Sequence, residues 1–205
     1  MMLFLTEVVL VRTFAWNLLD SKLFYKVISI FLYYLMNKKS KIIARRINTM
    51  ARIDQAIRKK MHKHKTSKWN SQIDKMNTLT MEKIIAMYGW PTIGMVGKKA
   101  SHNAWLLVQH ADHDTPFQEK CLRHIQKEFS SDPESIQPKE IAYLTDRIAI
   151  HHGKEQIFGT QFRIKPDGKL ELLPLKNRAK VNVLRKKYGL KTLQSYLKWV
   201  REKYK

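Results

Sequence analysis

The stretch PKEIAYLTDRIAIHHGKEQIFGTQFRIKPDGKLELLPL, residues 138–175, contains both kinds of secondary structure that we expect in this chain. Its first part has apolar residues at helical spacing, namely Ile141, Leu144 and Ile148. We therefore expect a helix that starts at Pro138 and stops at Gly153. Residues 155–164 and 169–175 are strand-like, and the intervening Pro166-Asp167-Gly168 has the chemistry of a tight turn. The stretch predicts a helix followed by a β-hairpin.

Helical patterns flank this stretch on both sides. We expect further helices at residues 42–61, 80–88, 98–113, 116–129, 179–188 and 193–204. Residues 62–71 are expected to be a basic loop, and Thr80 is expected to cap the helix that follows. The predicted fold class is mainly α (α+β), a helical bundle with one β-hairpin in the C-terminal half.

The composition is that of an ordinary globular protein. The 205 residues are 44% hydrophobic and include only seven Gly and six Pro. The single cysteine, Cys121, has apolar neighbours at helical spacing, which favours a buried structural thiol over a reactive one. With one cysteine, no disulfide forms within the chain.

The net charge of +22 is concentrated in two flanks. Residues 37–68 carry twelve Lys and Arg against one Asp, and residues 176–205 carry eleven against one Glu. Residues 69–175 are neutral overall, with thirteen basic and thirteen acidic side chains. Such flanks bind nucleic acid or an anionic membrane by attraction to phosphate, and they also occur as solvated helix faces. Both interpretations remain open.

The first thirty-six residues differ from the rest in being rich in Leu, Phe, Tyr and Val. Their longest uncharged run, residues 27–36, is too short to span a bilayer. They are interpreted as a weakly membrane-associating segment, an amphipathic docking segment, or translated sequence upstream of a start at Met36 or Met50. We expect a division into an extension at 1–36, a basic helix and loop at 37–68, and a core domain at 69–205, in a cytoplasmic protein.

Two polar features interrupt the apolar helix patterns. Asp54 lies on the apolar stripe of the first expected helix, where a carboxylate needs a partner, and Arg58 stands one turn away. On the helix at 98–113, a polar face lies opposite the apolar one and ends at Asp112. Its members are His102, Gln109, His110 and His113. This face is the best candidate for a site.

Several ordered motifs resemble a bacterial family catalogued as domain of unknown function 6624. The motifs are Ile53-Asp54-Gln55 with Arg58, Asp74 with Asn77, Tyr88-Gly89-Trp90-Pro91-Thr92, Gln109-His110-Ala111-Asp112 with Phe117-Gln118, Tyr143 to Arg147, Gly153 to Gln161, and Arg185 with Gly189-Leu190 and Tyr196. The resemblance covers about residues 50–196. Phe158 and Asn182 depart from the family pattern, which has Tyr and Asp there. The resemblance implies a shared fold and site, and no established activity.

The matched motifs contain more polar chemistry than packing requires. We expect His110, Asp112 and Asp146 as catalytic residues, with Asp54 and Asp74 in support. The expected substrate-binding residues are Arg147, Gln156, Gln161 and Trp90. Because His110 and Asp112 do not share a helix face, a His–Asp pair must use Asp54, Asp74 or Asp146. We expect His110, Asp112, Asp146, Arg147 and Gln156 to converge on one pocket.

Two functions from different classes follow. The first is a His/Asp-centred, hydrolase-like enzyme that acts on a small or anionic substrate, with His110 as general base or with a divalent metal that activates water. The second is a non-enzymatic module that binds protein or nucleic acid through the basic flanks. The sequence alone does not decide whether the protein is an enzyme.

Overall fold

The computed structural model describes residues 22–63, 71–165 and 169–203. The chain forms two compact units, Met1–Ile42 and Ile43–Lys205. In the first unit, the described part belongs to α2 (Lys22–Lys63), where Tyr25, Tyr33 and Met36 are among the exposed apolar side chains. Within the described ranges, no helix is both long and apolar enough to cross a bilayer. The predictions for residues 1–21 lie outside the described residues.

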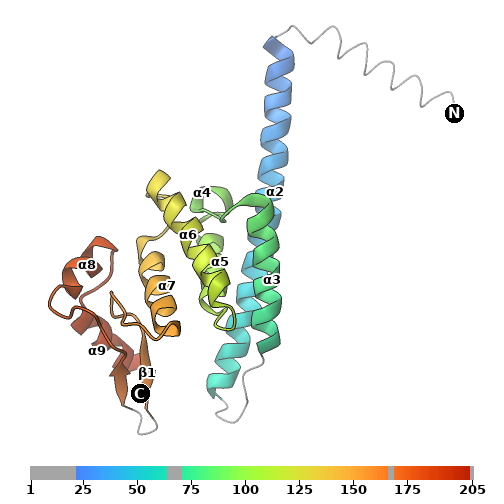
Figure 1. The fold of residues 1–205 in the computed structure, drawn as a ribbon. Coiled ribbons are helices and arrows are strands. Elements are labelled where there is room, and N and C mark those ends of the chain that lie inside the picture. Colours follow the sequence, from blue (N-terminus) through green and yellow to red (C-terminus); the bar gives the residue numbers. More distant parts are fainter. Residues whose placement is uncertain (1–21, 64–70, 166–168, 204–205) are drawn as a thin grey trace. The chain divides into compact units, whose positions relative to one another are not determined.

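The second unit is mainly helical (Figure 1). After the end of α2 its helices are α3 (Ser71–Tyr88), α4 (Ile93–Val96), α5 (Lys98–Gln109), α6 (Thr115–Ser131), α7 (Pro138–His151), α8 (Val181–Lys187) and α9 (Leu193–Lys203). Helix α5 is central, because it packs against α3, α4, α6 and α7. With the hairpin described below, this arrangement confirms the predicted fold class.

Helix ends differ from the predicted ones for local reasons. Helix α3 starts at Ser71, so Thr80 lies inside it and its hydroxyl donates to the Met76 carbonyl (3.0 Å) instead of capping a first turn. The predicted loop at 62–71 is wrong at both of its ends, and residues 64–70 lie outside the described residues. Helix α6 starts where predicted within one residue, because Asp114 accepts a hydrogen bond from the Phe117 amide (2.9 Å).

The predicted hairpin is present, and its strands are shorter than expected. Strands β1 (Phe162–Ile164) and β2 (Leu170–Leu172) are antiparallel, with Arg163 opposite Glu171. Residues 157–160 do not extend β1, because their amides bond to the carboxylate of Asp146 and are therefore not available to a neighbouring strand. In place of the expected strand at 155–164, the chain therefore has an irregular segment bound to Asp146, followed by the short strand β1.

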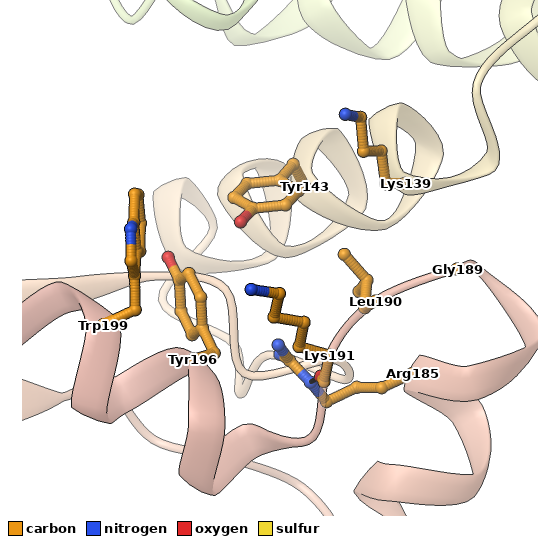
Figure 2. Close-up of a pocket in the computed structure, with 8 residues that line it drawn as sticks. All are labelled: Lys139, Tyr143, Arg185, Gly189, Leu190, Lys191, Tyr196 and Trp199. Atoms are coloured by element: carbon orange, nitrogen blue, oxygen red, sulfur yellow. Dashed lines mark hydrogen bonds between the residues drawn. The ribbon is translucent and has the colours of Figure 1, made fainter.

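The C-terminal helices form their own small core. Its buried members are Val181, Leu193, Tyr196, Leu197 and Val200. Tyr143 of α7 packs against this cluster and also against the main core, so it connects the two. Helices α7, α8 and α9 and the turn between α8 and α9 surround a cavity of about 340 Å³ (Figure 2).

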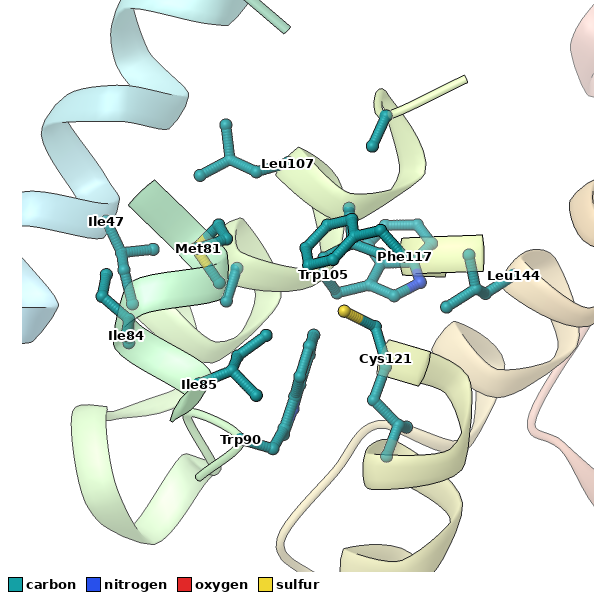
Figure 3. Packing of buried hydrophobic residues seen from close by; sticks show 14 of the residues in the cluster. Ile47, Met81, Ile84, Ile85, Trp90, Trp105, Leu107, Phe117, Cys121 and Leu144 are labelled. Carbon is teal, nitrogen blue, oxygen red and sulfur yellow. The ribbon is translucent and has the colours of Figure 1, made fainter. Parts of the chain in front are cut away.

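The main core lies among α2, α3, α5, α6 and α7 of the second unit. Trp90, Trp105, Phe117 and Cys121 gather at its centre (Figure 3). Leu144 is fully buried there, and truncation of such a side chain to Ala costs about 2–5 kcal/mol. Burial raises the pKa of the Cys121 thiol well above its ordinary value, so the thiol is unreactive.

Candidate functional site

A buried carboxylate, Asp54 of α2, binds the imidazole of His110 at the C-terminal end of α5. The distance from His110 Nδ1 to Asp54 Oδ2 is 2.8 Å. Because a carboxylate only accepts, Nδ1 carries a proton, and Nε2 holds a lone pair whenever the ring is neutral. Asp54 has no exposed surface, whereas the His110 side chain is 16% exposed. His110 thus combines a fixed ring orientation with partial access to solvent.

Further donors compensate the buried charge of Asp54. Arg58 Nε lies 3.1 Å from Oδ1, and Gln55 Nε2 donates to Oδ2 (2.9 Å). Burial alone would raise the pKa of Asp54, but the hydrogen bond and charge of His110, then Gln55 and Arg58, outweigh it, so the pKa is lowered. Arg58 Nη2 also bonds Asp74 of α3 (2.7 Å). Asp54, Arg58, Asp74 and His110, which we call the His110 network, therefore join α2, α3 and α5.

Two buried amide side chains lie close in the sequence to members of the His110 network. Asn77 stands three residues after Asp74 on α3, and Gln109 directly precedes His110. Asn77 Nδ2 and Gln109 Nε2 are buried and have no hydrogen-bond partner among the described residues. Buried donors without partners are rare and costly in folded proteins. Four other buried polar atoms of the described residues are also without partners, so this state does not by itself mark a ligand site.

A second, more exposed network is centred on Asp112, in the turn between α5 and α6. Arg147 of α7 binds both oxygens of Asp112, with 2.6 Å from Nε to Oδ1. Arg147 Nη1 also reaches Gln161 Oε1 at 3.4 Å. Burial opposes ionisation of Asp112, but Arg147, helped by His151 and Gln118, holds its pKa below the usual value. Asp112 is therefore an ionised partner of Arg147.

His151 belongs to the Asp112 network, although it was not among the site residues expected from the sequence. Its Nδ1 lies 3.1 Å from Gln118 Oε1, and its Nε2 lies 3.5 Å from Asp112 Oδ1. Burial, together with the charges of Arg147 and His152, lowers the pKa of His151 against the opposing effect of Asp112. Helical spacing could have identified His151, because it lies four residues after Arg147 on α7 and shares its helix face.

Asp146 has a different environment from its neighbour Arg147. Its side chain is fully buried and accepts from the amides of Ile157, Phe158 and Thr160 and from the Thr160 hydroxyl, at 2.7–2.9 Å. Gln156 is also fully buried, and its Nε2 donates to the carbonyls of Gln161 and Leu173. Both side chains thus shape the segment at 156–161 and present no surface to a substrate.

The residues that were expected to converge on one pocket lie in two hydrogen-bond networks. Asp112, Arg147 and Gln161 are linked to Asp146 through Thr160, because Gln161 Nε2 donates to Thr160 Oγ1 (3.1 Å). His110 is linked to Asp54 and Asp74 instead. Trp90, an expected substrate-binding residue, is 2% exposed and packs in the main core (Figure 3).

The polar residues expected on one face of the helix at 98–113 also have separate partners. His102 Nδ1 lies 2.9 Å from Glu140 of α7, whereas His110 bonds to α2. Gln109 is buried, and α5 ends there, so that His113 lies beyond the helix. In the described ranges, no three His, Cys, Asp or Glu side chains are arranged to hold a metal ion.

The fold and the motifs define a mainly helical domain with one hairpin and polar networks around α5 and α7. Residues 42–205 match the Family of unknown function (DUF6624), and the chain belongs to that family. The match confirms the resemblance seen in the sequence and extends it from about residue 50 to residue 42, and to the last residue. No curated protein and no solved structure matches the chain.

Proposed function

We propose that the domain is a hydrolase for a small anionic ester and that His110 is its general base. The observation that carries the proposal is the 2.8 Å hydrogen bond from His110 Nδ1 to the fully buried Asp54. A histidine that is oriented through Nδ1 by a carboxylate and keeps its Nε2 lone pair is the arrangement that general-base catalysis requires.

In the proposed mechanism, His110 Nε2 accepts a proton from water as the water oxygen attacks the ester carbon or phosphorus. Asp54 stabilises the imidazolium that forms, because its carboxylate already accepts the hydrogen bond from His110 Nδ1. The same Nε2 then returns its proton to the leaving oxygen, so the overall reaction adds one water across the ester bond. A positioned base of this kind accelerates a reaction by about 10²- to 10⁴-fold.

Arg147 of the Asp112 network supplies the anion preference in this proposal. The Asp112–Arg147 pair forms a polar wall in which Arg147, 26% exposed, contributes positive potential. We assign Asp146 and Gln156 to the support of that wall, since their polar atoms are engaged with the segment at 156–161.

The test measures hydrolysis of p-nitrophenyl phosphate, bis-p-nitrophenyl phosphate and the neutral p-nitrophenyl acetate by the full chain. The informative variant is His110→Asn, because its amide nitrogen takes the place of Nδ1 and still donates to Asp54, while the base is lost. We expect kcat to fall by about 10²- to 10⁴-fold with an unchanged melting temperature. His124→Asn, on α6, is the matched control and should retain full activity.

The opposite result has a clear meaning. If hydrolysis of every substrate that is turned over survives His110→Asn, His110 is not the base. If the wild-type chain hydrolyses none of them and His110→Ala only destabilises it, the His110 network is a structural clamp. The binding-module interpretation would then take first place.

A further inference from the structure

The cavity among α7, α8 and α9 differs in chemistry from the His110 network. Six of the residues that line its volume of about 340 Å³ are aromatic or cationic, and no lining residue is acidic (Figure 2). They are Lys139, Tyr143, Arg185, Lys191, Tyr196 and Trp199. The volume lies within the range of small-molecule sites.

Aromatic side chains form one side of the cavity. The rings of Tyr196 and Trp199 are 6.1 Å apart and inclined by 27°, whereas Tyr143 meets Tyr196 edge-on at 6.2 Å. Trp199 is 46% exposed at the rim of the cavity, and the Nζ atom of Lys203 lies 4.9 Å from the centre of its ring. Figure 2 shows Trp199 and Tyr196 on adjacent turns of α9, both directed toward the cavity. Such rings stack with planar heterocycles.

A buried guanidinium lies below these rings. Arg185 is 1% exposed, and its Nε and Nη1 donate to the carbonyls of Lys191 (2.6 Å) and Phe158 (2.6 Å). Its carbon Cζ lies 5.0 Å from the centre of the Tyr196 ring. Nη1 also donates to the Gly159 carbonyl (3.2 Å), and none of the salt bridges found among the described residues involves Arg185. The charge is therefore held by neutral carbonyls and retains the capacity to bind an anion.

Two lysines add positive charge at the cavity. Lys139 comes from the first turn of α7 and Lys191 from the turn before α9, and both line the cavity; Figure 2 shows Lys191 directed into the space between α7 and α9. The surrounding residues 176–205 contain eleven basic residues against one acidic residue. The local potential therefore favours phosphate, and it raises the rate at which phosphate-bearing ligands arrive.

We propose that this cavity binds a nucleotide, with its base against Tyr196 and Trp199 and its phosphate against Arg185, Lys139 and Lys191. The aromatic side and the cationic side lie within one cavity, which matches a ligand that has a planar ring at one end and an anion at the other. The nucleotide is free or is the phosphorylated end of a nucleic-acid strand. This proposal uses none of the residues of the His110 network, so either proposal can fail alone.

The test is isothermal titration of the full chain with AMP, and with adenosine and ribose 5-phosphate as the two halves of the ligand. Trp199→Ala removes the stacking ring and Lys191→Met removes a cation, and both positions are accessible, so the fold should be retained. We expect each change to weaken AMP binding about tenfold or more, and each half-ligand to bind more weakly than AMP. Lys127→Met, an exposed change on α6, should leave AMP affinity unchanged.

The source of the nucleotide is resolved by a second titration with a short 5′-phosphorylated DNA strand and the same strand without its phosphate. Preference for the phosphorylated strand, lost in Trp199→Ala and Lys191→Met, would assign the cavity to strand ends and support the nucleotide chemistry. The proposal would be overturned if neither AMP nor the strand bound. It would also be overturned if Trp199→Ala, Lys191→Met and Lys127→Met all bound the ligand as tightly as the wild-type chain.

Discussion

Asp54 and Asp146 are both fully buried carboxylates, but their partners differ in kind. Asp54 accepts from side chains on helices, namely Gln55, Arg58 and His110. Asp146 accepts mainly from backbone amides of the segment at 157–160. Side-chain donors can rotate and carry protons, whereas backbone donors are fixed by the path of the chain. Under the proposed function, the first carboxylate takes part in the chemistry, whereas the second fixes the path of the chain.

The fixed donors around Asp146 lead to the largest expected effect. In Asp146→Asn, the new amide nitrogen faces backbone N–H groups that cannot turn away, so buried donors lose their acceptor. We expect the free energy of unfolding to fall by about 3–5 kcal/mol. In Asp54→Asn, the side chains of Gln55 and Arg58 can reorient, so we expect a loss of about 1–2 kcal/mol. Urea unfolding of both variants measures the difference.

The comparison would fail if the order were reversed. A larger loss in Asp54→Asn than in Asp146→Asn would show that the ionic network around α2 stabilises the fold more than the amide-bound loop does. Equal losses would show that burial alone, and not the type of donor, sets the energetic role of the two carboxylates.

Gly159 gives a smaller effect within the segment that Asp146 and Arg185 hold together. Its φ of +69° is strained for other residues, and a Cβ there would lie 2.9 Å from Leu193 Cδ1 of α9. Gly159→Ala is therefore expected to lower the free energy of unfolding by about 1–3 kcal/mol. The matched control is Gly94→Ala in α4, where a Cβ meets open space at ordinary backbone angles.

Thermal unfolding of the two glycine variants provides the comparison. Equal melting temperatures for Gly159→Ala and Gly94→Ala would contradict the close packing of this segment against α9. A loss confined to Gly159→Ala would support it.

The smallest expected effect concerns His151. Its Nδ1 contacts the amide oxygen of Gln118, whereas Nδ1 of His110 contacts a carboxylate. Because the folded-state pKa of His151 is lowered, the unfolded chain takes up its proton first. The contribution of His151 to stability is therefore complete above its ordinary pKa of about 6.5 and is lost as the pH falls below it. In His151→Asn, the decline of stability between pH 7.5 and 5.5 should be shallower.

Chemical denaturation at several pH values measures that slope, and an NMR titration of the His151 ring measures its pKa directly. A pKa above the ordinary value would reverse the sign of the expected slope. It would mean that Asp112, and not burial, dominates the environment of His151.

The mainly helical fold and the hairpin were predictable because their signals are local. Apolar spacing located most of the helices, and the Pro-Asp-Gly turn located the hairpin. The strand lengths and the start of α3 were not predictable, since they depend on contacts. The segment before β1 leaves the strand conformation because its amides bond Asp146 from another element.

In the candidate site, too, local signals were predictable and contacts between helices were not. The sequence selected Asp54 and His110 and left three carboxylates open as partners of the histidine; the packing of α2 against α5 selected Asp54. His151 and the cavity around Arg185 were missed, because neither has a signature at a single position of the chain.

The sequence by itself determined the family, the helical class and the hairpin, and it selected the candidate site residues, since these follow from residue type and short spacing. Only the tertiary structure decided which carboxylate meets His110, that Asp146 binds a loop, and that aromatic and basic side chains from α7, α8 and α9 enclose one cavity. These contacts join residues far apart in the chain, and their geometry is set by how the helices pack, which no local pattern encodes.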